Sequence, residues 1–97
     1  MNIYDKARWQ IEGGIPENMV VAHFKFMFEW LNEYKLLSEY GVEILNDGIN
    51  EDAILTDEMV NVGGKNFLDK YYDQYISQID YGNKENTNLL KELYYRV

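Results

Sequence analysis

The side chains with the greatest capacity for chemistry are seven carboxylates in the middle of the chain. They are Glu39, Glu43, Asp47, Glu51, Asp52, Asp57 and Glu58. No lysine or arginine occurs between Leu36 and Gly64, the segment that holds them. Carboxylates this concentrated could bind a hard cation, serve as an acid–base pair, or attract a basic macromolecule. Spacing and chain length decide among these three chemistries.

Metal binding and carboxylate catalysis fit the sequence poorly. An EF-hand loop starting at Asp47 would place Ile49 at the third ligand position and would lack the glycine of the sixth. A catalytic pair such as Asp57 and Glu58 would need a substrate cleft, and a chain of 97 residues leaves little room for one. The sequence therefore predicts neither a bound metal nor a cofactor.

The residue types of other catalytic sites are scarce. His23 is the single histidine, cysteine is absent, and no serine lies in a nucleophile-elbow pattern, so a hydrolase triad is excluded. His23 lies between apolar rows, which predicts a core histidine held by one hydrogen bond. The pairs Gly13-Gly14 and Gly63-Gly64 lack the lysine and hydroxyl of a phosphate-binding loop, so we expect turns there. The sequence predicts a protein without catalytic residues, that is, not an enzyme.

The distribution of charge limits the classes of molecule that this chain is expected to bind. Nine basic and seventeen acidic residues give a net charge of −8, which disfavours binding to nucleic acids and anionic lipids. The flanking residues 1–35 and 65–97 are close to neutral, so segment 36–64 carries seven of these eight negative charges. A concentrated negative surface steers a basic protein into contact, and a basic protein partner is the functional interpretation. The alternative is a solvated face that serves solubility alone.

The strongest helical pattern begins at Pro16 and runs to about Tyr34. Apolar residues recur there at spacings of three and four, which places them on one helix face. They are Val20, Phe24, Met27, Leu31 and Tyr34, with a neighbouring row of Met19, His23, Phe26 and Trp30. The polar arc that remains is narrow, so we expect a central and mostly buried helix.

Two further helices are expected towards the end of the chain. After Gly63-Gly64, an amphipathic pattern runs from Lys65 to about Ile79. The turn sequence Tyr81-Gly82-Asn83 interrupts it, and Asn86 is a candidate N-cap for a last helix that reaches Val97.

Segment 36–64 is harder to interpret. Short helices are expected, including a brief helical turn capped by Thr56. The alternative is a β-hairpin in the region 42–55 with Val42–Leu45 as one arm, because Asp47-Gly48 is a hairpin signal.

Together these patterns predict a mainly α protein, a single domain of residues 1–97 built as a small bundle of about three to five helices. We also expect a cytoplasmic protein, because neither a secretory signal nor an apolar run long enough for a membrane is present.

Two parts of the sequence resemble an uncharacterised family of small acidic bacterial proteins. The first comprises Tyr4-Asp5-Lys6-Ala7-Arg8-Trp9-Gln10, then Gly13-Gly14-Ile15-Pro16 and the helix that contains Trp30. The second comprises Leu55-Thr56-Asp57-Glu58 followed by Gly64, Phe67, Tyr71 and Tyr72. Members of that family usually have a histidine after the tryptophan, where this chain has Gln10. From the residues themselves we expect Tyr4 and Trp9 to cap the core.

The resemblance leads by analogy to proteins that neutralise bacterial toxins. Such an immunity protein or antitoxin would occlude a basic toxin through its acidic surface. The residues expected to contact the partner are Glu39, Glu43, Asp47, Glu51, Asp52, Asp57, Glu58, Tyr71 and Tyr75. The tyrosines are included because Tyr often anchors protein interfaces. The alternative function is a small regulatory or assembly subunit that forms a homo- or hetero-oligomer through its aromatic helix faces.

Overall fold

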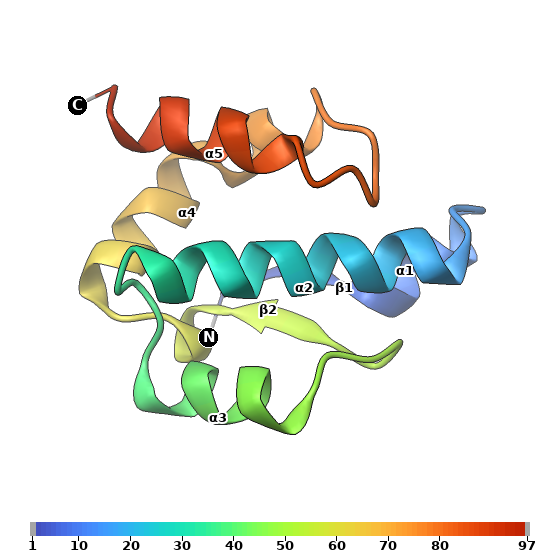
Figure 1. Ribbon diagram of the computed structural model, residues 1–97, viewed down its shortest axis with the longest axis horizontal. Coiled ribbons are helices and arrows are strands. Elements are labelled where there is room, and N and C mark those ends of the chain that lie inside the picture. Colours follow the sequence, from blue (N-terminus) through green and yellow to red (C-terminus); the bar gives the residue numbers. More distant parts are fainter. Residues whose placement is uncertain (1, 97) are drawn as a thin grey trace.

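The computed structural model describes residues 2–96, which form a mainly α fold with two short strands (Figure 1). In chain order the elements are β1 (Ile3–Lys6), α1 (Ala7–Glu12), α2 (Glu17–Glu33), α3 (Glu39–Asp47), β2 (Ile54–Thr56), the 3-10 helix η1 (Asp57–Met59), α4 (Val62–Ile76) and α5 (Asn86–Tyr94). The expected fold class, a small single-domain helical protein, is confirmed. Among residues 2–96 no helix combines the length and the apolar character that crossing a bilayer requires.

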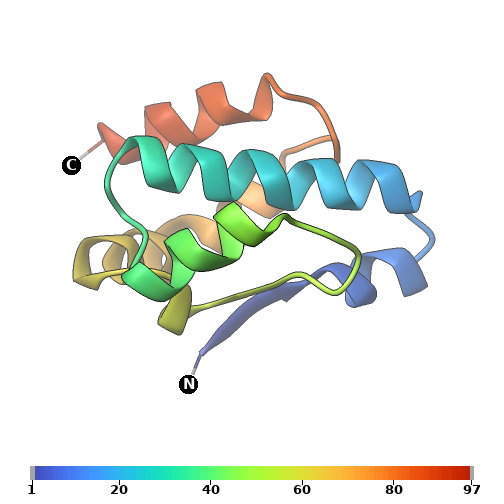
Figure 2. The same ribbon diagram turned by 60° about the horizontal axis from the view of Figure 1, so that its bottom comes forward.

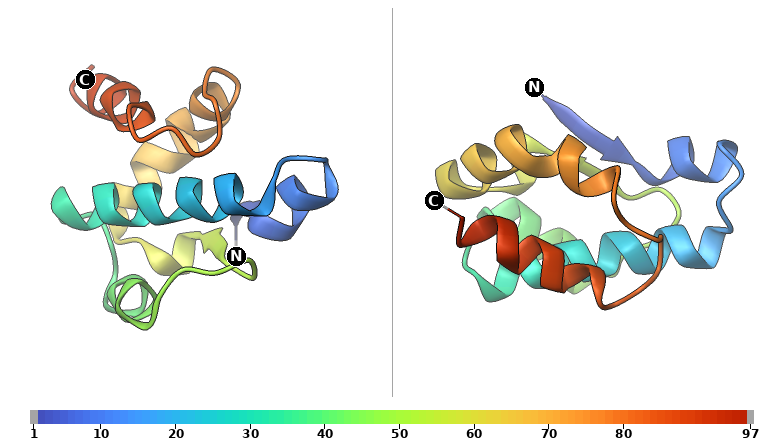
Figure 3. Two further views of the ribbon diagram at one scale, coloured as in Figure 1. Left: turned by 45° about the vertical axis from the view of Figure 1, so that its right-hand side comes forward. Right: turned by 90° about the horizontal axis from the view of Figure 1, so that it is seen from above.

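Helix α2 is the centre of the molecule. Figure 1 shows it running between α5 on one side and the strands with α3 on the other, and the left view of Figure 3 shows the same order. Val20, Phe24, Met27 and Leu31 are at most 1% exposed. Burial of each such side chain contributes about 1.5 to 3 kcal/mol, so the face predicted from the spacing supplies much of the core. The expectation of a central, mostly buried helix is confirmed.

Helix α3 occupies the first half of the acidic segment. The side-chain oxygen of Ser38 accepts a hydrogen bond from the amide of Gly41 at 3.1 Å and caps the helix start. The helix ends at Gly48, whose φ of 103° is accessible to glycine but strained for other residues. Asp47-Gly48 is therefore a helix terminus rather than a hairpin turn. Val42–Leu45 is helical, so the alternative that made it a hairpin arm is wrong.

The strand β2 pairs with β1 at the opposite end of the sequence. The pairing is antiparallel, with Ile3 opposite Thr56 and Lys6 opposite Ile54. The amide of Ala7 donates to the carbonyl of Ala53 at 2.9 Å and continues the contact beyond the ladder. Figure 2 shows β2 between β1 and α3. The two strands thus tie the acidic segment to the N-terminus, a long-range contact that the sequence patterns do not predict.

The brief helical turn after β2 is confirmed. Thr56 caps η1, because its side-chain oxygen accepts a hydrogen bond from the amide of Glu58 at 3.1 Å. The helix that follows begins at Val62, three residues earlier than predicted. Its cap is Asn61, whose side-chain oxygen accepts from the amide of Gly64 at 3.0 Å. Gly63-Gly64 therefore forms part of the first helical turn rather than a break before it.

The ends of the last two helices also differ from expectation. Helix α4 ends at Ile76 rather than Ile79. Asn86 is not the N-cap of α5: it is the first helical residue, and its side-chain amide donates to the carbonyl of Asp80 at 2.6 Å. Helix α5 ends at Tyr94, and the predicted end at Val97 lies outside the described residues. The Asn86 contact instead holds the α4–α5 loop against the start of α5.

Trp9 does not cap the core. Its side chain is 51% exposed, and the ammonium group of Lys6 lies 5.4 Å from the ring centroid. The buried residues near the N-terminus are Asp5 and Ala7, whereas Tyr4 is half-buried and donates its hydroxyl hydrogen to Asp69. The core role expected for Trp9 is therefore wrong, because α1 turns this side chain towards solvent.

The exposure of Trp9 leads to a stability prediction. Trp9→Ala is expected to lower the free energy of unfolding by about 1 kcal/mol or less, because about half of the side chain is already hydrated in the folded state. Urea denaturation measures this change. A loss of about 3 kcal/mol or more, the usual result for a buried tryptophan, would contradict the exposed position.

Candidate interaction surface

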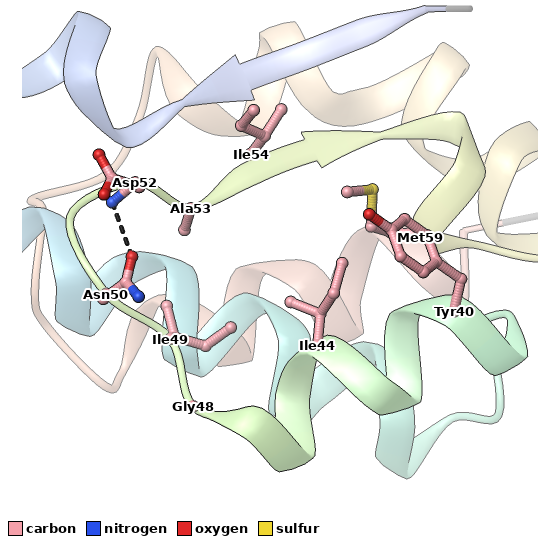
Figure 4. A pocket seen from close by; sticks show the side chains of 9 residues that line it. All are labelled: Tyr40, Ile44, Gly48, Ile49, Asn50, Asp52, Ala53, Ile54 and Met59. Carbon is pink, nitrogen blue, oxygen red and sulfur yellow. Dashed lines mark hydrogen bonds between the residues drawn. The ribbon is translucent and has the colours of Figure 1, made fainter.

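A shallow pocket of about 280 Å³ lies between α3 and β2 (Figure 4). Its lining residues are Tyr40, Ile44, Gly48, Ile49, Asn50, Asp52, Ala53, Ile54 and Met59. All nine belong to segment 36–64, the part of the chain without lysine or arginine. We call this pocket the α3–β2 groove.

The walls of the α3–β2 groove are largely apolar. Tyr40 and Ile44 lie one turn apart on α3, and Figure 4 shows both side chains directed from α3 towards β2. Tyr40 is 49% exposed and Ile54 of β2 is 36% exposed, whereas Met59 is buried. Large apolar side chains left in water beside a pocket are typical of surfaces that another molecule covers.

The closed end of the groove is fixed by backbone contacts between α3 and η1. The amide of Ser38 donates to the carbonyl of Met59 at 3.0 Å, and the Ser38 hydroxyl donates to the carbonyl of Glu58 at 2.7 Å. A Cβ atom at Gly41 would overlap the carbonyl oxygen of Met59. Only glycine lets α3 approach η1 this closely, so the helix is anchored at one end of the groove.

Six of the seven carboxylates line the groove or adjoin one of its lining residues in the sequence. Asp52 lines it, and the other five each precede a lining residue directly in the sequence: Glu39, Glu43, Asp47, Glu51 and Glu58. On α3, Glu39, Glu43 and Asp47 are spaced by four residues, which places them in one stripe along the helix. Asp57 is half-buried, and one of its carboxylate oxygens accepts a hydrogen bond from the amide of Asn2 at 3.2 Å. We call Asp52 and these five adjoining carboxylates the acidic rim.

Arg8 of α1 contacts the acidic rim. Its guanidinium lies 2.9 Å from the carboxylate of Asp52, and both side chains are more than half exposed. Within residues 2–96 the other lysine or arginine ion pairs join Lys65 to Asp69 and Arg96 to Glu92, outside the acidic segment. An exposed pair such as Arg8–Asp52 contributes about 1 kcal/mol at most. The rim therefore keeps a strongly negative charge.

The two tyrosines expected at the interface lie elsewhere. Tyr71 is half-buried and lines a separate hollow with Phe67, Lys70 and Tyr94 on α4 and α5. Tyr75 is only 2% exposed, so its ring is not accessible to a partner of the folded protein. Tyr75 is therefore removed from the candidate interface. The exposed tyrosine beside the acidic rim is Tyr40, which sequence reasoning missed because α3 had not been distinguished from a hairpin arm.

A second cluster of chemistry-bearing side chains is buried. One carboxylate oxygen of Asp5 accepts from the Tyr72 hydroxyl at 2.6 Å, and the other accepts from Gln10 at 2.9 Å. The Nε2 atom of His23 lies 3.3 Å from the same hydroxyl. Because Tyr72 donates its hydrogen to Asp5, Nε2 of His23 is assigned as the donor to Tyr72. The expected core histidine with one hydrogen bond is confirmed.

Burial shifts the titration of this cluster. Loss of hydration lowers the pKa of His23 to about 4, because the charged imidazolium cannot be solvated there. Burial also raises the pKa of Asp5, although hydrogen bonds from Gln10, Tyr72 and the Lys6 amide oppose that change. Asp5 and His23 are 2% and 3% exposed, so no substrate can reach them in this structure. The cluster ties β1 and α2 to α4.

Comparisons with known proteins place the chain in no established group. No protein-family model matches it, and no curated protein or solved structure matches it either. The resemblance to a family of small acidic bacterial proteins therefore stays a prediction.

Proposed function

We propose that this chain is a non-enzymatic, cytoplasmic immunity protein or antitoxin that neutralises a basic toxin by occlusion. The toxin would bind over the α3–β2 groove and its acidic rim. The supporting observation is that the apolar lining and the acidic rim come from the same base-free segment. Solubility alone would account for charge, but it would not account for Tyr40 and Ile54 being exposed within that charge.

The two components of the surface have separate roles in binding. Carboxylates on the acidic rim attract a basic partner over about one Debye length, roughly 8 Å at physiological ionic strength, and thereby raise the association rate. The apolar groove acts only after contact, when it excludes water and slows dissociation. The rim carboxylates would also occupy cationic positions at which the toxin binds a negatively charged substrate such as nucleic-acid phosphate.

The steering role leads to a kinetic prediction. A variant that neutralises four carboxylates of the acidic rim should associate with the partner about tenfold more slowly and with a weaker salt dependence. Its substitutions are Glu43→Gln, Glu51→Gln, Asp52→Asn and Glu58→Gln. Purification of the complex from the native host, followed by mass spectrometry, identifies the partner for this measurement. Stopped-flow kinetics at several salt concentrations then give the association rate.

A matched control separates local charge from net charge. Glu12→Gln, Glu33→Gln, Asp73→Asn and Asp80→Asn neutralise four exposed carboxylates outside segment 36–64. This control should associate within about twofold of the wild-type rate, because its carboxylates lie away from the groove. Equal slowing in both variants would leave net charge as the cause and would remove the acidic rim from the mechanism.

One observation favours the alternative function of an assembly subunit. Aromatic side chains from α2, α4 and α5 form a cluster in which the ring centroids of Trp30 and Tyr34 lie 4.6 Å apart, and those of Tyr34 and Tyr94 lie 5.1 Å apart. Tyr95, at the edge of this cluster, is 65% exposed. A stable homodimer in sedimentation that is indifferent to salt would support this function, whereas a monomer with high affinity for a basic protein would support the toxin inhibitor.

A further inference from the structure

The α3–β2 groove has the dimensions of a site for one large side chain. An apolar protein cavity of about 150 Å³ holds a benzene-sized group, and this groove measures about 280 Å³. Small-molecule sites usually begin at about 300 Å³ and enclose their ligand more fully. The groove lies between α3 and the segment that leads into β2 (Figure 4), and its lining residues Tyr40 and Ile54 are 49% and 36% exposed. A side chain projecting from another protein fits this shape better than a free metabolite.

The apolar lining specifies the chemistry of that side chain. Tyr40, Ile44 and Ile49 offer aromatic and aliphatic contacts, and Met59 adds a flexible thioether at the closed end. A leucine, isoleucine, methionine or aromatic residue would gain dispersion contacts there and would cover Tyr40 at the same time. A charged side chain at the same depth would lose its hydration.

The acidic rim specifies the neighbours of that side chain. On α3, Glu43 directly precedes Ile44 in the sequence, and on the other wall Asp52 lines the groove itself. The chain's own Arg8 shows that a guanidinium fits at this rim, since its Nε donates to Asp52 at 3.0 Å. Arginine is suited to such a position because its fork of donors matches a carboxylate. Cationic residues on both sides of the inserted side chain would therefore meet carboxylates.

From this geometry we infer that the α3–β2 groove binds a protein segment in which one large apolar residue is flanked by lysine or arginine. The inference rests on the proposed function, since it describes the part of a basic toxin that would contact this chain. The apolar residue of the partner segment would contact Tyr40, Ile44 and Ile54. Its flanking cations would contact the carboxylates of the acidic rim. A segment of only a few residues is enough to place one apolar side chain in the groove and a cation at the acidic rim on each side of it.

A selection with random peptides tests the inference without the native partner. A phage-displayed library of 12-residue peptides is selected on the immobilised wild-type protein, and enriched peptides are then synthesised. Enriched sequences should carry a large apolar residue with lysine or arginine within two positions on each side. Their affinity should fall about tenfold or more for Tyr40→Ala and for Ile54→Thr, because both substitutions remove part of the apolar wall.

Tyr95→Ala is the matched control, because Tyr95 is also an exposed tyrosine but does not line the groove. It should leave peptide affinity unchanged, and circular dichroism verifies that all three variants are folded. The inference is overturned if no sequence is enriched, if enriched peptides lack flanking cations, or if Tyr40→Ala and Ile54→Thr bind them as the wild type does. If peptides bind in this way but the host contains no toxin partner, the inference about the groove stands and the proposed function is refuted.

A second copy of the chain is the competing occupant, and sedimentation of the wild type and the variants identifies it. Trp9 is an exposed apolar residue preceded by Arg8, with Lys6 over its ring, so it has the character expected of the inserted segment. Concentration-dependent dimerisation that both Trp9→Ala and Tyr40→Ala abolish would assign the groove to self-association. That result would overturn the inference of a separate protein partner.

Discussion

Replacing Gly64 with alanine is expected to lower the free energy of unfolding by about 2 to 3 kcal/mol. A Cβ atom at this position would lie 2.5 Å from the carbonyl oxygen of Leu36 and 2.7 Å from Cβ of Val60. The Leu36 carbonyl also accepts a hydrogen bond from the amide of Asn61 at 3.0 Å, so neither side can move without loss of a backbone contact. Overpacking of this kind usually costs about 1 to 3 kcal/mol.

The neighbouring Gly63 provides the control. A Cβ atom there would meet the side chain of Leu36 at 3.3 Å, and a side-chain end can shift by a few tenths of an ångström. Alanine also favours the helical state over glycine by about 0.5 to 1 kcal/mol. Gly63→Ala is thus expected to change stability by less than about 1 kcal/mol in urea denaturation. Equal losses for the two variants would contradict the close packing of the first turn of α4 against the backbone of Leu36 and the side chain of Val60.

Acidification from pH 6.5 to pH 4 is expected to remove about 3 kcal/mol of stability through His23. The unfolded chain binds a proton on this histidine near pH 6.5, whereas the folded chain resists protonation until about pH 4. Between these values the unfolded state holds more protons, so stability is complete above pH 6.5 and declines as the pH falls. Denaturation midpoints measured across this range give the effect.

His23→Gln separates this contribution from those of other groups. Glutamine retains a hydrogen-bond donor for Tyr72 but does not titrate, so the decline between pH 6.5 and pH 4 should be smaller by about 3 kcal/mol. The raised pKa of Asp5 acts in the opposite sense, because the folded chain binds that proton more readily than the unfolded chain. It is common to both proteins and largely cancels in the comparison. Identical pH profiles would show that His23 is hydrated in the folded state.

Local sequence patterns predicted the helices more accurately than they predicted the long-range contacts. The three- and four-residue spacing in α2 predicted its extent and most of its buried face, because those properties depend on neighbours in sequence. Met19, which the spacing placed in an apolar row, is 45% exposed, and the fully buried Phe28 was in neither row. The pairing of β1 with β2 joins Ile3 to Thr56, and no turn signal connects such distant strands. Gly64 shows the same limit: its role depends on Leu36, which the fold alone brings near.

The charged half of the candidate site could be predicted, and the apolar half could not. The absence of lysine and arginine from segment 36–64 is visible in the sequence and marks the acidic rim. Whether Tyr40 and Ile54 are buried or exposed depends on how α3 sits against η1, which Gly41 and Ser38 determine. The pairing of Arg8 with Asp52 likewise follows from the docking of α1 beside β2.

Hydrogen–deuterium exchange of the chain, alone and in complex with its purified partner, tests the central claim most directly. If a basic protein binds over the α3–β2 groove, the partner should slow exchange of backbone amides in residues 39–59 more than elsewhere. Protection confined to the C-terminal parts of α4 and α5, with residues 39–59 unchanged, would contradict the claim and would place the interface on the aromatic cluster.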